Sequence, residues 1–127
     1  MNPILSVLVV DDYLPLVSSL AQILHRNGYE VQTANSGFEA LRMLKAHPVD
    51  VLLTDFRMPL MSGLELYREI KKKHISLTAI LMTADASEEL LEQGIAEGVR
   101  AVLDKPLDID YLIALISSLK VIQPLVH

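Results

Sequence analysis

Five polar residues that can serve phosphate or metal chemistry each come directly after a short apolar run. They are Asp11 and Asp12 after residues 5–10, Asp55 after 51–54, Thr83 after 77–82, and Lys105 after 101–104. If these runs are parallel strands, their carboxyl ends share one edge of the sheet, which is where open α/β sheets bind ligands. Three carboxylates, one hydroxyl and one ammonium would then converge. That set suits a carboxylate that binds a divalent cation and accepts a phosphoryl group.

The composition is that of one folded domain. The chain has 127 residues, the usual size of a single domain, and 51% of them are hydrophobic, which argues against disorder. The net charge of −5 argues against direct binding to nucleic acid, because a binder of the phosphate backbone needs a basic face. The absence of cysteine excludes disulfides and thiolate metal sites, and it is compatible with the cytoplasmic location that we expect.

We expect no membrane segment and no secretory signal. No basic region precedes the first apolar run, and acidic residues follow it at once. No apolar run reaches the ~20 residues that a membrane helix needs. We expect one domain over residues 3–122 and a short tail at 123–127.

Strand and helix patterns alternate five times along the chain. The expected strands cover residues 4–10, 30–34, 51–54, 77–82 and 100–103, and the expected helices cover 14–27, 36–46, 64–73, 87–98 and 109–119. This alternation predicts a parallel sheet with right-handed crossovers. The first, third and fourth strands are apolar almost throughout, which predicts burial on both faces, whereas the second is the most polar and suits a sheet edge.

Four short motifs accompany these strand ends. They are V-L-V-V-D-D at 7–12, D-F-R-M-P-L-M-S-G at 55–63, L-M-T-A at 81–84 and D-K-P at 104–106. In this order, and each at a strand end, they resemble the receiver domain of two-component response regulators, of which the bacterial chemotaxis response regulator is the best-known single-domain member. The resemblance covers nearly the whole chain. It implies an α/β fold of the doubly wound, flavodoxin-like (βα)5 type, a three-layer sandwich with strand order 2-1-3-4-5.

The resemblance also assigns an acceptor and a metal site. Asp55 would accept the phosphoryl group, since a carboxylate can act as a nucleophile and form an acyl phosphate. Asp12 and Asp55 would bind Mg²⁺ directly, with Mn²⁺ as the alternative ion. Asp11 would bind it through water, and the backbone carbonyl of Arg57 would add another oxygen. Mg²⁺ prefers hard oxygen ligands and keeps several waters, so a few protein ligands suffice.

The remaining assigned residues surround the phosphoryl group. By the same resemblance, Lys105, the Thr83 hydroxyl and the backbone N–H of Ala84 would contact its oxygens. We expect Arg57 and Asp85 to overhang the mouth of the pocket and to pair across it. The domain would thus be a phosphoacceptor rather than an enzyme, catalysing only its own phosphorylation and dephosphorylation.

Taken singly, each feature has an ordinary structural explanation. Adjacent acids usually mark a solvated turn, and a lone Asp or Lys can lie in any surface turn. Glycine at 63 would suit a backbone with positive φ, and the lysines at 71–73 would suit a solvated helix end, where cations favour the dipole. The functional interpretation is preferred, because the structural one needs independent coincidences at four strand ends.

One position departs from the family pattern. Where family members usually carry Tyr or Phe, three residues before the lysine of Lys-Pro, this chain has Val102. Val102 has no ring to rotate and a stiff χ1, which leaves the aromatic half of the family's switch in question. Two hypotheses therefore stand: a phosphorylation-controlled signalling module, and a receiver-like constitutive interaction or dimerisation module with impaired switching. A phosphatase ranks third, because no additional base or pocket is visible.

The expected partners follow from the same resemblance. The donor would be a sensor histidine kinase or a phosphotransfer protein. The output face would be formed by the helix at 87–98, the strand at 100–103 and the helix at 109–119, and would bind an output domain or a second copy. We expect an exposed apolar patch on the last helix at Ile109, Ile113 and Leu115, with cover by residues 121–126 as the structural alternative.

Overall fold

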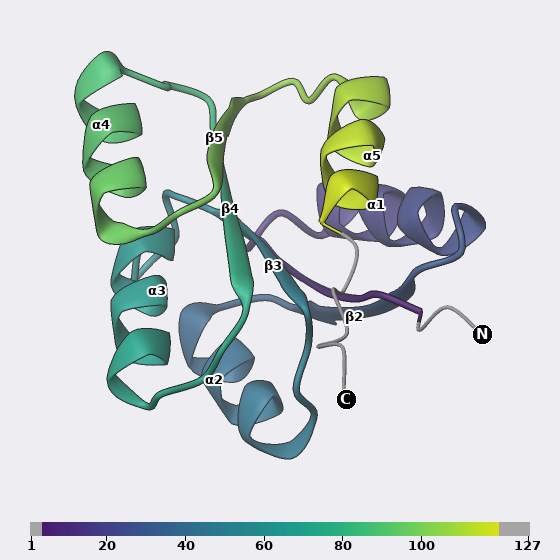
Figure 1. Ribbon diagram of the computed structural model, residues 1–127, viewed down its shortest axis with the longest axis horizontal. Helices are drawn as coiled ribbons and strands as arrows, with labels where there is room; N and C mark the ends of the chain where they lie inside the picture. The colour runs from purple at the N-terminus through teal and green to yellow at the C-terminus, as the bar shows by residue number, and fades with distance from the viewer. Residues whose placement is uncertain (1–3, 120–127) are drawn as a thin grey trace, which may run out of the picture.

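The computed structural model describes residues 4–119, where five strands alternate with five helices (Figure 1). The strands are β1 (Ser6–Val10), β2 (Glu30–Ala34), β3 (Val51–Asp55), β4 (Thr78–Thr83) and β5 (Ala101–Asp104). The helices are α1 (Leu14–Arg26), α2 (Gly37–Ala46), α3 (Gly63–Lys72), α4 (Glu88–Glu97) and α5 (Ile109–Ser118). Every expected element is present, with ends that differ by at most about two residues.

The strands form one parallel sheet in the order β2-β1-β3-β4-β5, which confirms the expected flavodoxin-like topology. Helices α1 and α5 cover one face of the sheet, and α2, α3 and α4 cover the other (Figure 1). The apolar strands β1, β3 and β4 occupy the centre, while the polar strand β2 lies at an edge, as expected.

The core consists of two hydrophobic clusters, one on each face of the sheet. Alternate residues of a strand point to opposite faces, and β1 shows this clearly. Leu8 and Val10 belong to the cluster beneath α2 and α3, whereas Val7 and Val9 belong to the cluster beneath α1 and α5. All four side chains are fully buried, so β1 is packed against helices on both of its faces.

Two strands extend one residue beyond their apolar runs. Asp55 pairs with Met82 across β3 and β4, and Thr83 pairs with Asp104 across β4 and β5. Hydrogen bonding to the neighbouring strand thus continues past the point where the apolar pattern stops. As a result, Asp55 and Thr83 are the last residues of the paired strands, at the carboxyl end of the sheet.

The expected apolar patch on the last helix is wrong in part. Leu115 is buried, with 7% exposure, and the two isoleucines expected beside it are partly buried against the same core. The exposed apolar side chains near this surface are instead Leu91 and Ile95 on α4, at 44% and 47%, and Tyr111 on α5, at 55%. The sheet and α1 together bury more of the α5 surface than its sequence pattern indicates.

The expected tail at 123–127, and the segment 121–126 considered as a cover for α5, lie outside the described residues. Within residues 4–119, no helix is long and apolar enough to cross a membrane.

Candidate functional site

The carboxyl ends of β1 and β3 bring three acidic residues together. One oxygen from each of Asp11, Asp12 and Asp55 lies within 4.8 Å of the other two. β1 and β3 are adjacent and paired in register, with Val10 opposite Thr54, so the acids that follow both residues meet at one level. Asp11 is fully buried and Asp55 is 7% exposed, whereas Asp12 is exposed. The expected convergence of these three side chains is present.

Lys105 reaches the same cluster from the loop after β5. Its Nζ donates a hydrogen bond to Asp11 Oδ2 at 2.8 Å and lies 3.1 Å from Asp55 Oδ1. The backbone N–H of Lys105 donates to the Thr83 carbonyl at 2.8 Å, which fixes the start of this loop against the end of β4. The ammonium therefore bridges two carboxylates that lie 44 positions apart in the sequence.

The cluster holds more negative than positive charge. Burial raises the pKa of Asp55, and the two neighbouring carboxylates add to the rise, although the hydrogen bond with Lys105 opposes it. Burial by itself would lower the pKa of Lys105, but its hydrogen bonds with Asp11 and Asp55 outweigh burial and hold the pKa above its ordinary value. One protonated lysine thus faces three carboxylates. The arrangement favours a divalent cation, which removes the remaining repulsion between them.

Thr83 lies at the end of β4, one residue beyond the partner of Asp55. Its side chain is almost fully buried, with 1% exposure, and its Oγ1 accepts a hydrogen bond from the backbone N–H of Asp85 at 3.2 Å. The hydroxyl proton remains free to donate to an acceptor near Asp55. Thr83 therefore lies on the strand next to the one that carries Asp55, and its hydroxyl holds the start of the loop that leads into α4.

The turn from β3 to α3 packs directly on the backbone of Asp55. Gly63 has no positive φ, so that sequence expectation is wrong; glycine is required instead because a Cβ there would collide with the Asp55 carbonyl oxygen. The positive φ of this turn, 71°, belongs to Leu60. Gly63 N–H donates to the carbonyl of Phe56 at 2.8 Å, and Ser62 forms a capping box at the start of α3.

Two further hydrogen bonds around the acids were not expected from the sequence. Thr54 is fully buried, and its hydroxyl donates to the Asp55 carbonyl at 3.1 Å. The backbone N–H of Tyr13 donates to Asp11 Oδ1 at 3.0 Å. Neither contact has a signal in the sequence, because threonine is an ordinary strand residue and a backbone N–H carries no residue identity.

Arg57 and Asp85 pair at the mouth of the site, as expected. Arg57 Nη2 lies 3.7 Å from Asp85 Oδ2, and both side chains are more than 70% exposed. The partners come from the loops after β3 and β4 respectively. Ala84, between Thr83 and Asp85, is exposed. The contacts of its N–H with phosphate, and of the Arg57 carbonyl with a metal, stay predictions.

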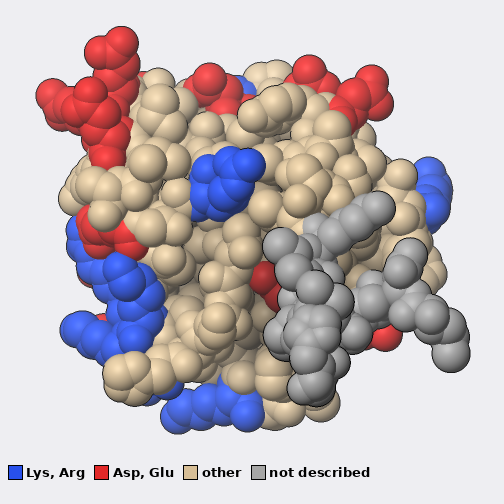
Figure 2. All heavy atoms as spheres, viewed as in Figure 1, with Lys and Arg blue, Asp and Glu red and all other residues tan. Residues whose placement is uncertain are grey.

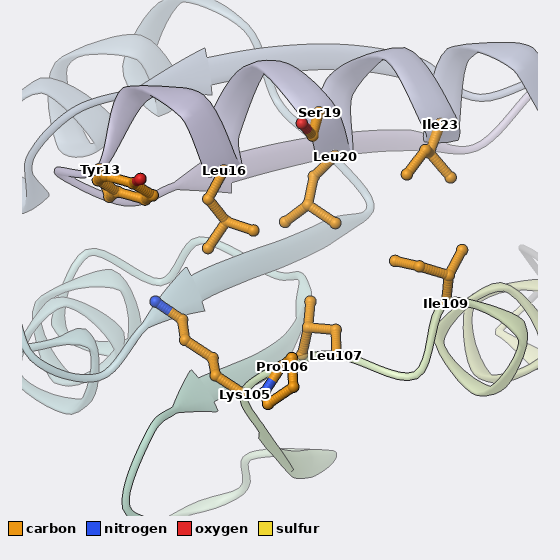
Figure 3. Close-up of a pocket in the computed structure, with 9 residues that line it drawn as sticks. All are labelled: Tyr13, Leu16, Ser19, Leu20, Ile23, Lys105, Pro106, Leu107 and Ile109. Carbon is orange, nitrogen blue, oxygen red and sulfur yellow. The ribbon is translucent and has the colours of Figure 1, made fainter.

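An apolar groove opens beside the site, between α1 and the loop from β5 to α5 (Figure 3). It has a volume of about 530 Å³, and Lys105 forms its end next to the acids. Its lining residues are Tyr13, Leu16, Ser19, Leu20, Ile23, Lys105, Pro106, Leu107 and Ile109. The groove therefore lies directly beside Lys105, the residue that bridges Asp11 and Asp55.

Comparison with known proteins gives a consistent result. The family model described as "Response regulator receiver domain" matches residues 7–117. A response regulator receiver protein of Anaeromyxobacter sp. (strain Fw109-5) is 40% identical over 108 residues, which cover 85% of this chain and 45% of that protein. The transcriptional regulatory protein GlrR of Escherichia coli (strain K12) is 39% identical over 105 residues, covering 83% of this chain and 24% of GlrR.

Solved structures agree with the sequence relatives. Vibrio cholerae chemotaxis protein CheY4 superposes with a TM-score of 0.86 at 28% identity, covering 92% of this chain and 99% of the other. The chain thus matches nearly all of that protein, but it spans less than half the length of the two sequence relatives.

Proposed function

The chain belongs to the family of response regulator receiver domains, and we propose that it accepts a phosphoryl group on Asp55 in a Mg²⁺-dependent reaction. It is a signalling domain homologous to the receivers of phosphorelays, and not an enzyme in the ordinary sense. The proposed donor is a sensor histidine kinase or a phosphotransfer protein. The observation that supports the proposal most strongly is the cluster of three carboxylates bridged by Lys105.

In the proposed transfer, a carboxylate oxygen of Asp55 attacks phosphorus. A new P–O bond forms, the bond from phosphorus to the donor nitrogen breaks, and its electron pair stays on the donor imidazole. Lys105 already lies 3.1 Å from Asp55 Oδ1, so its charge is placed to meet a phosphoryl oxygen. The Thr83 hydroxyl and the Ala84 N–H would contact the other two oxygens. In dephosphorylation, water attacks the same phosphorus and releases the Asp55 carboxylate.

We assign Mg²⁺, or alternatively Mn²⁺, to the three acids and the Arg57 carbonyl. The residues fit such an ion because all are hard oxygen donors and the acids carry more charge than Lys105 neutralises. When bound, the ion neutralises charge on the transferring phosphoryl group. Asp11 is also held by Tyr13 N–H and Lys105, which suits its proposed role as a ligand through water.

Intact mass spectrometry tests the transfer. With acetyl phosphate and Mg²⁺, the wild type should gain one phosphoryl mass, and Asp55→Asn should gain none. Asp104→Asn serves as the matched control, because Asp104 is an exposed strand-end acid outside the cluster, and it should behave as wild type. Full acid-labile phosphate in Asp55→Asn would refute Asp55 as the acceptor.

We propose that α4, β5 and α5 form the output face, for an output domain or a second copy of the chain. Leu91, Ile95 and Tyr111 expose apolar surface there, which suits association. Val102 on β5 carries no aromatic ring, so we expect incomplete switching. Moving a two-state equilibrium from 1:99 to 99:1 requires about 5.5 kcal/mol of differential stabilisation, and we expect this chain to develop less.

Sedimentation with and without Mg²⁺ and beryllofluoride measures the output. We expect partial association in both states, with a modest shift on activation. A strictly monomeric protein that becomes fully dimeric on activation would show that Val102 does not impair the switch. The constitutive interaction module is not favoured, because the acids, Thr83 and Lys105 are all in place. We place the reaction in the cytoplasm as part of the same proposal.

A further inference from the structure

Strand β2 has one free edge. Within residues 4–119 it lies at the end of the sheet and pairs only with β1 (Figure 1). The N–H of Glu30 donates to a carbonyl just before β1, and the carbonyl of Ala34 accepts from an N–H just after it, so both residues direct their backbone groups toward β1. Backbone directions alternate along a strand, and the N–H and carbonyl groups of Val31 and Thr33 therefore point away from the sheet.

This edge has little to prevent another strand from pairing with it. Folded proteins usually protect strand edges with charged side chains, prolines or bulges. The sequence of β2 is E-V-Q-T-A, in which Glu30, at the first position, is the only charged residue, and it contains no proline. Its pairing with β1 is regular along its whole length, without a bulge. The outward groups of Val31 and Thr33 are thus open to a partner.

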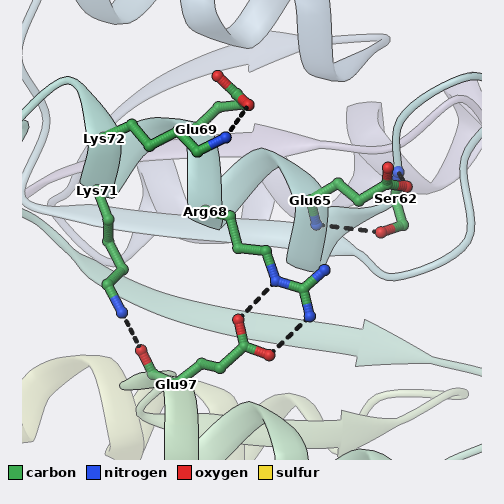
Figure 4. A network of polar contacts seen from close by, with 7 residues as sticks. All are labelled: Ser62, Glu65, Arg68, Glu69, Lys71, Lys72 and Glu97. Atoms are coloured by element: carbon green, nitrogen blue, oxygen red, sulfur yellow. Dashed lines mark hydrogen bonds and ion pairs between the residues drawn. The ribbon is translucent and has the colours of Figure 1, made fainter.

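The surface around α3 and α4 differs from this edge, because it is rich in charge and its charges are paired. Figure 2 shows basic side chains gathered over α3 and acidic ones over the start of α4. Arg68 of α3 donates two hydrogen bonds to the Glu97 carboxylate, at 2.6 and 2.7 Å, and Lys71 donates to the Glu97 carbonyl at 2.6 Å (Figure 4). These groups satisfy one another within the chain, whereas β2 offers backbone groups on a side where residues 4–119 provide no neighbouring strand.

The free edge is complementary to a second copy of itself. In an antiparallel pair, two opposed residues exchange both backbone hydrogen bonds if their groups point at each other. Val31 opposite the partner's Thr33 meets this condition. Twofold symmetry repeats the pair, so the contact contains two bonds in each of two pairs. In this register Gln32 lies on the symmetry axis, opposite its own copy.

The side chains suit the same register. Valine and threonine are β-branched, and β-branched side chains that face each other across strands favour pairing. The Oε1 atom of Gln32 is buried and has no hydrogen-bond partner among residues 4–119. If both Gln32 side chains turn toward the axis, each carboxamide can donate to the oxygen of the other. Glu30 faces the partner's Ala34, so the two Glu30 carboxylates do not oppose each other.

We propose that two copies of this chain associate by antiparallel pairing of their β2 strands, centred on Gln32. Two sheets of five strands join into one of ten, the usual upper limit for a twisted open sheet. Strand β5 lies at the opposite edge, so the proposed output face of each copy stays free. The association needs no phosphoryl group, and the contact is small enough to be weak and reversible.

Disulfide formation tests the register. The chain has no cysteine, so Gln32→Cys introduces a single thiol. An antiparallel pair without mutual hydrogen bonds places its Cα atoms ~4.5 Å apart, which a disulfide can span. Thr33→Cys is the matched control, because its thiol faces the partner's Val31 and lies diagonally from its own copy, ~7–8 Å away. Under mild oxidation, Gln32→Cys should form the linked dimer at least about tenfold faster than Thr33→Cys.

Equal rates for the two cysteine variants, or no linked dimer from Gln32→Cys, would overturn the inference. The comparison is stringent, because Thr33 is exposed and Gln32 is partly buried, so random collisions favour linkage at Thr33.

Sedimentation equilibrium without Mg²⁺ or beryllofluoride tests the backbone bonds. Thr33→Pro removes an outward N–H and leaves the ladder to β1 intact, since proline is tolerated on the free side of an edge strand. It should weaken association about tenfold, equivalent to ~1.4 kcal/mol. Thr33→Val is the matched control: it keeps the N–H and the branched shape, and it should associate within about twofold of wild type.

A Thr33→Pro variant that associates as strongly as Thr33→Val would overturn the inference, and so would a wild type that stays monomeric up to about 1 mM. Circular dichroism shows whether Thr33→Pro is folded; if it is not, the relative rates of the two cysteine variants decide. Association through the output face does not depend on the N–H of Thr33, so the two variants separate the two surfaces. The inference is also independent of phosphoryl transfer, because Asp55→Asn should associate through β2 as wild type does.

Discussion

Replacing Asp12 by alanine should abolish most of the stabilisation that Mg²⁺ gives this protein. Asp12 belongs to the acid cluster but is exposed, so its removal leaves no cavity and no unpaired buried group. Asp11, by contrast, is fully buried and holds both Lys105 and the Tyr13 N–H, and its removal would disturb the fold. Asp12 is therefore the cluster position at which metal binding can be tested separately from folding.

The expected magnitude follows from linkage. Metal at 100 times its Kd stabilises the native state by ~2.7 kcal/mol. Unfolding a chain of 127 residues carries an entropy of ~0.27 kcal/mol/K, so the wild type should gain ~10 °C in Tm. If the loss of Asp12 weakens binding ~100-fold, the same metal concentration gives ~0.4 kcal/mol, and the gain in Tm falls to ~1.5 °C.

Thermal unfolding followed by circular dichroism, with and without Mg²⁺, measures both shifts. Asp110→Ala is the control, because Asp110 is an exposed acid on α5 outside the cluster, and it should keep the full metal-dependent rise. Equal rises in wild type and Asp12→Ala would mean that the metal binds elsewhere, and the reasoning from the cluster would be refuted.

Three further outcomes follow from the same contacts. Arg57→Ala removes the exposed pair over the site mouth, worth ~0.2–1 kcal/mol, so phosphate loss should accelerate up to a few-fold; an unchanged dephosphorylation rate would contradict this. Because burial raises the pKa of Asp55, its ionisation opposes folding at high pH, so Asp55→Asn should raise the metal-free Tm at pH 8. That advantage should disappear at about pH 3.5, below the ordinary carboxyl pKa, and a pH-independent difference would count against it. Gly98→Ala should cost ~1–3 kcal/mol in urea unfolding, since φ is +108° and a Cβ would lie 2.8 Å from the Tyr67 hydroxyl. Gly28→Ala, with φ +91° and open space around the Cβ, should cost less, and equal costs would show that the Tyr67 contact is unimportant.

The site could be predicted from the sequence because the topology of the sheet determines where its residues lie. Asp11, Asp55 and Thr83 each follow an apolar run, and a parallel sheet places all such ends at one edge. Lys105 follows from the same rule, although its contacts with Asp11 and Asp55 span the whole domain. The exact ends of the strands were harder to predict, because Asp55 and Thr83 pair with neighbouring strands although they are polar.

Contacts between helices could not be predicted from the sequence in the same way. Arg68 and Glu97 lie 29 residues apart, and nothing in either segment indicates that they meet. Lys71 sits in a run of lysines that suits a solvated helix end, yet its ammonium satisfies a carbonyl of another helix. Leu115 looked like surplus apolar surface but is buried, because the depth to which a helix face is covered depends on the neighbouring helix.

The amino-acid sequence was sufficient to predict the order of the elements, the polar edge strand and the set of residues at the strand ends. These follow from apolar periodicity and chain connectivity, which are local properties. Other features are visible only in the tertiary structure. Gly63 is needed because a Cβ there would meet the Asp55 carbonyl oxygen. Thr54 and the Tyr13 N–H form hydrogen bonds with the acids, and Lys71 of α3 donates a hydrogen bond to the last turn of α4. Such contacts depend on the distances between packed elements, and those distances are set by the whole core at once.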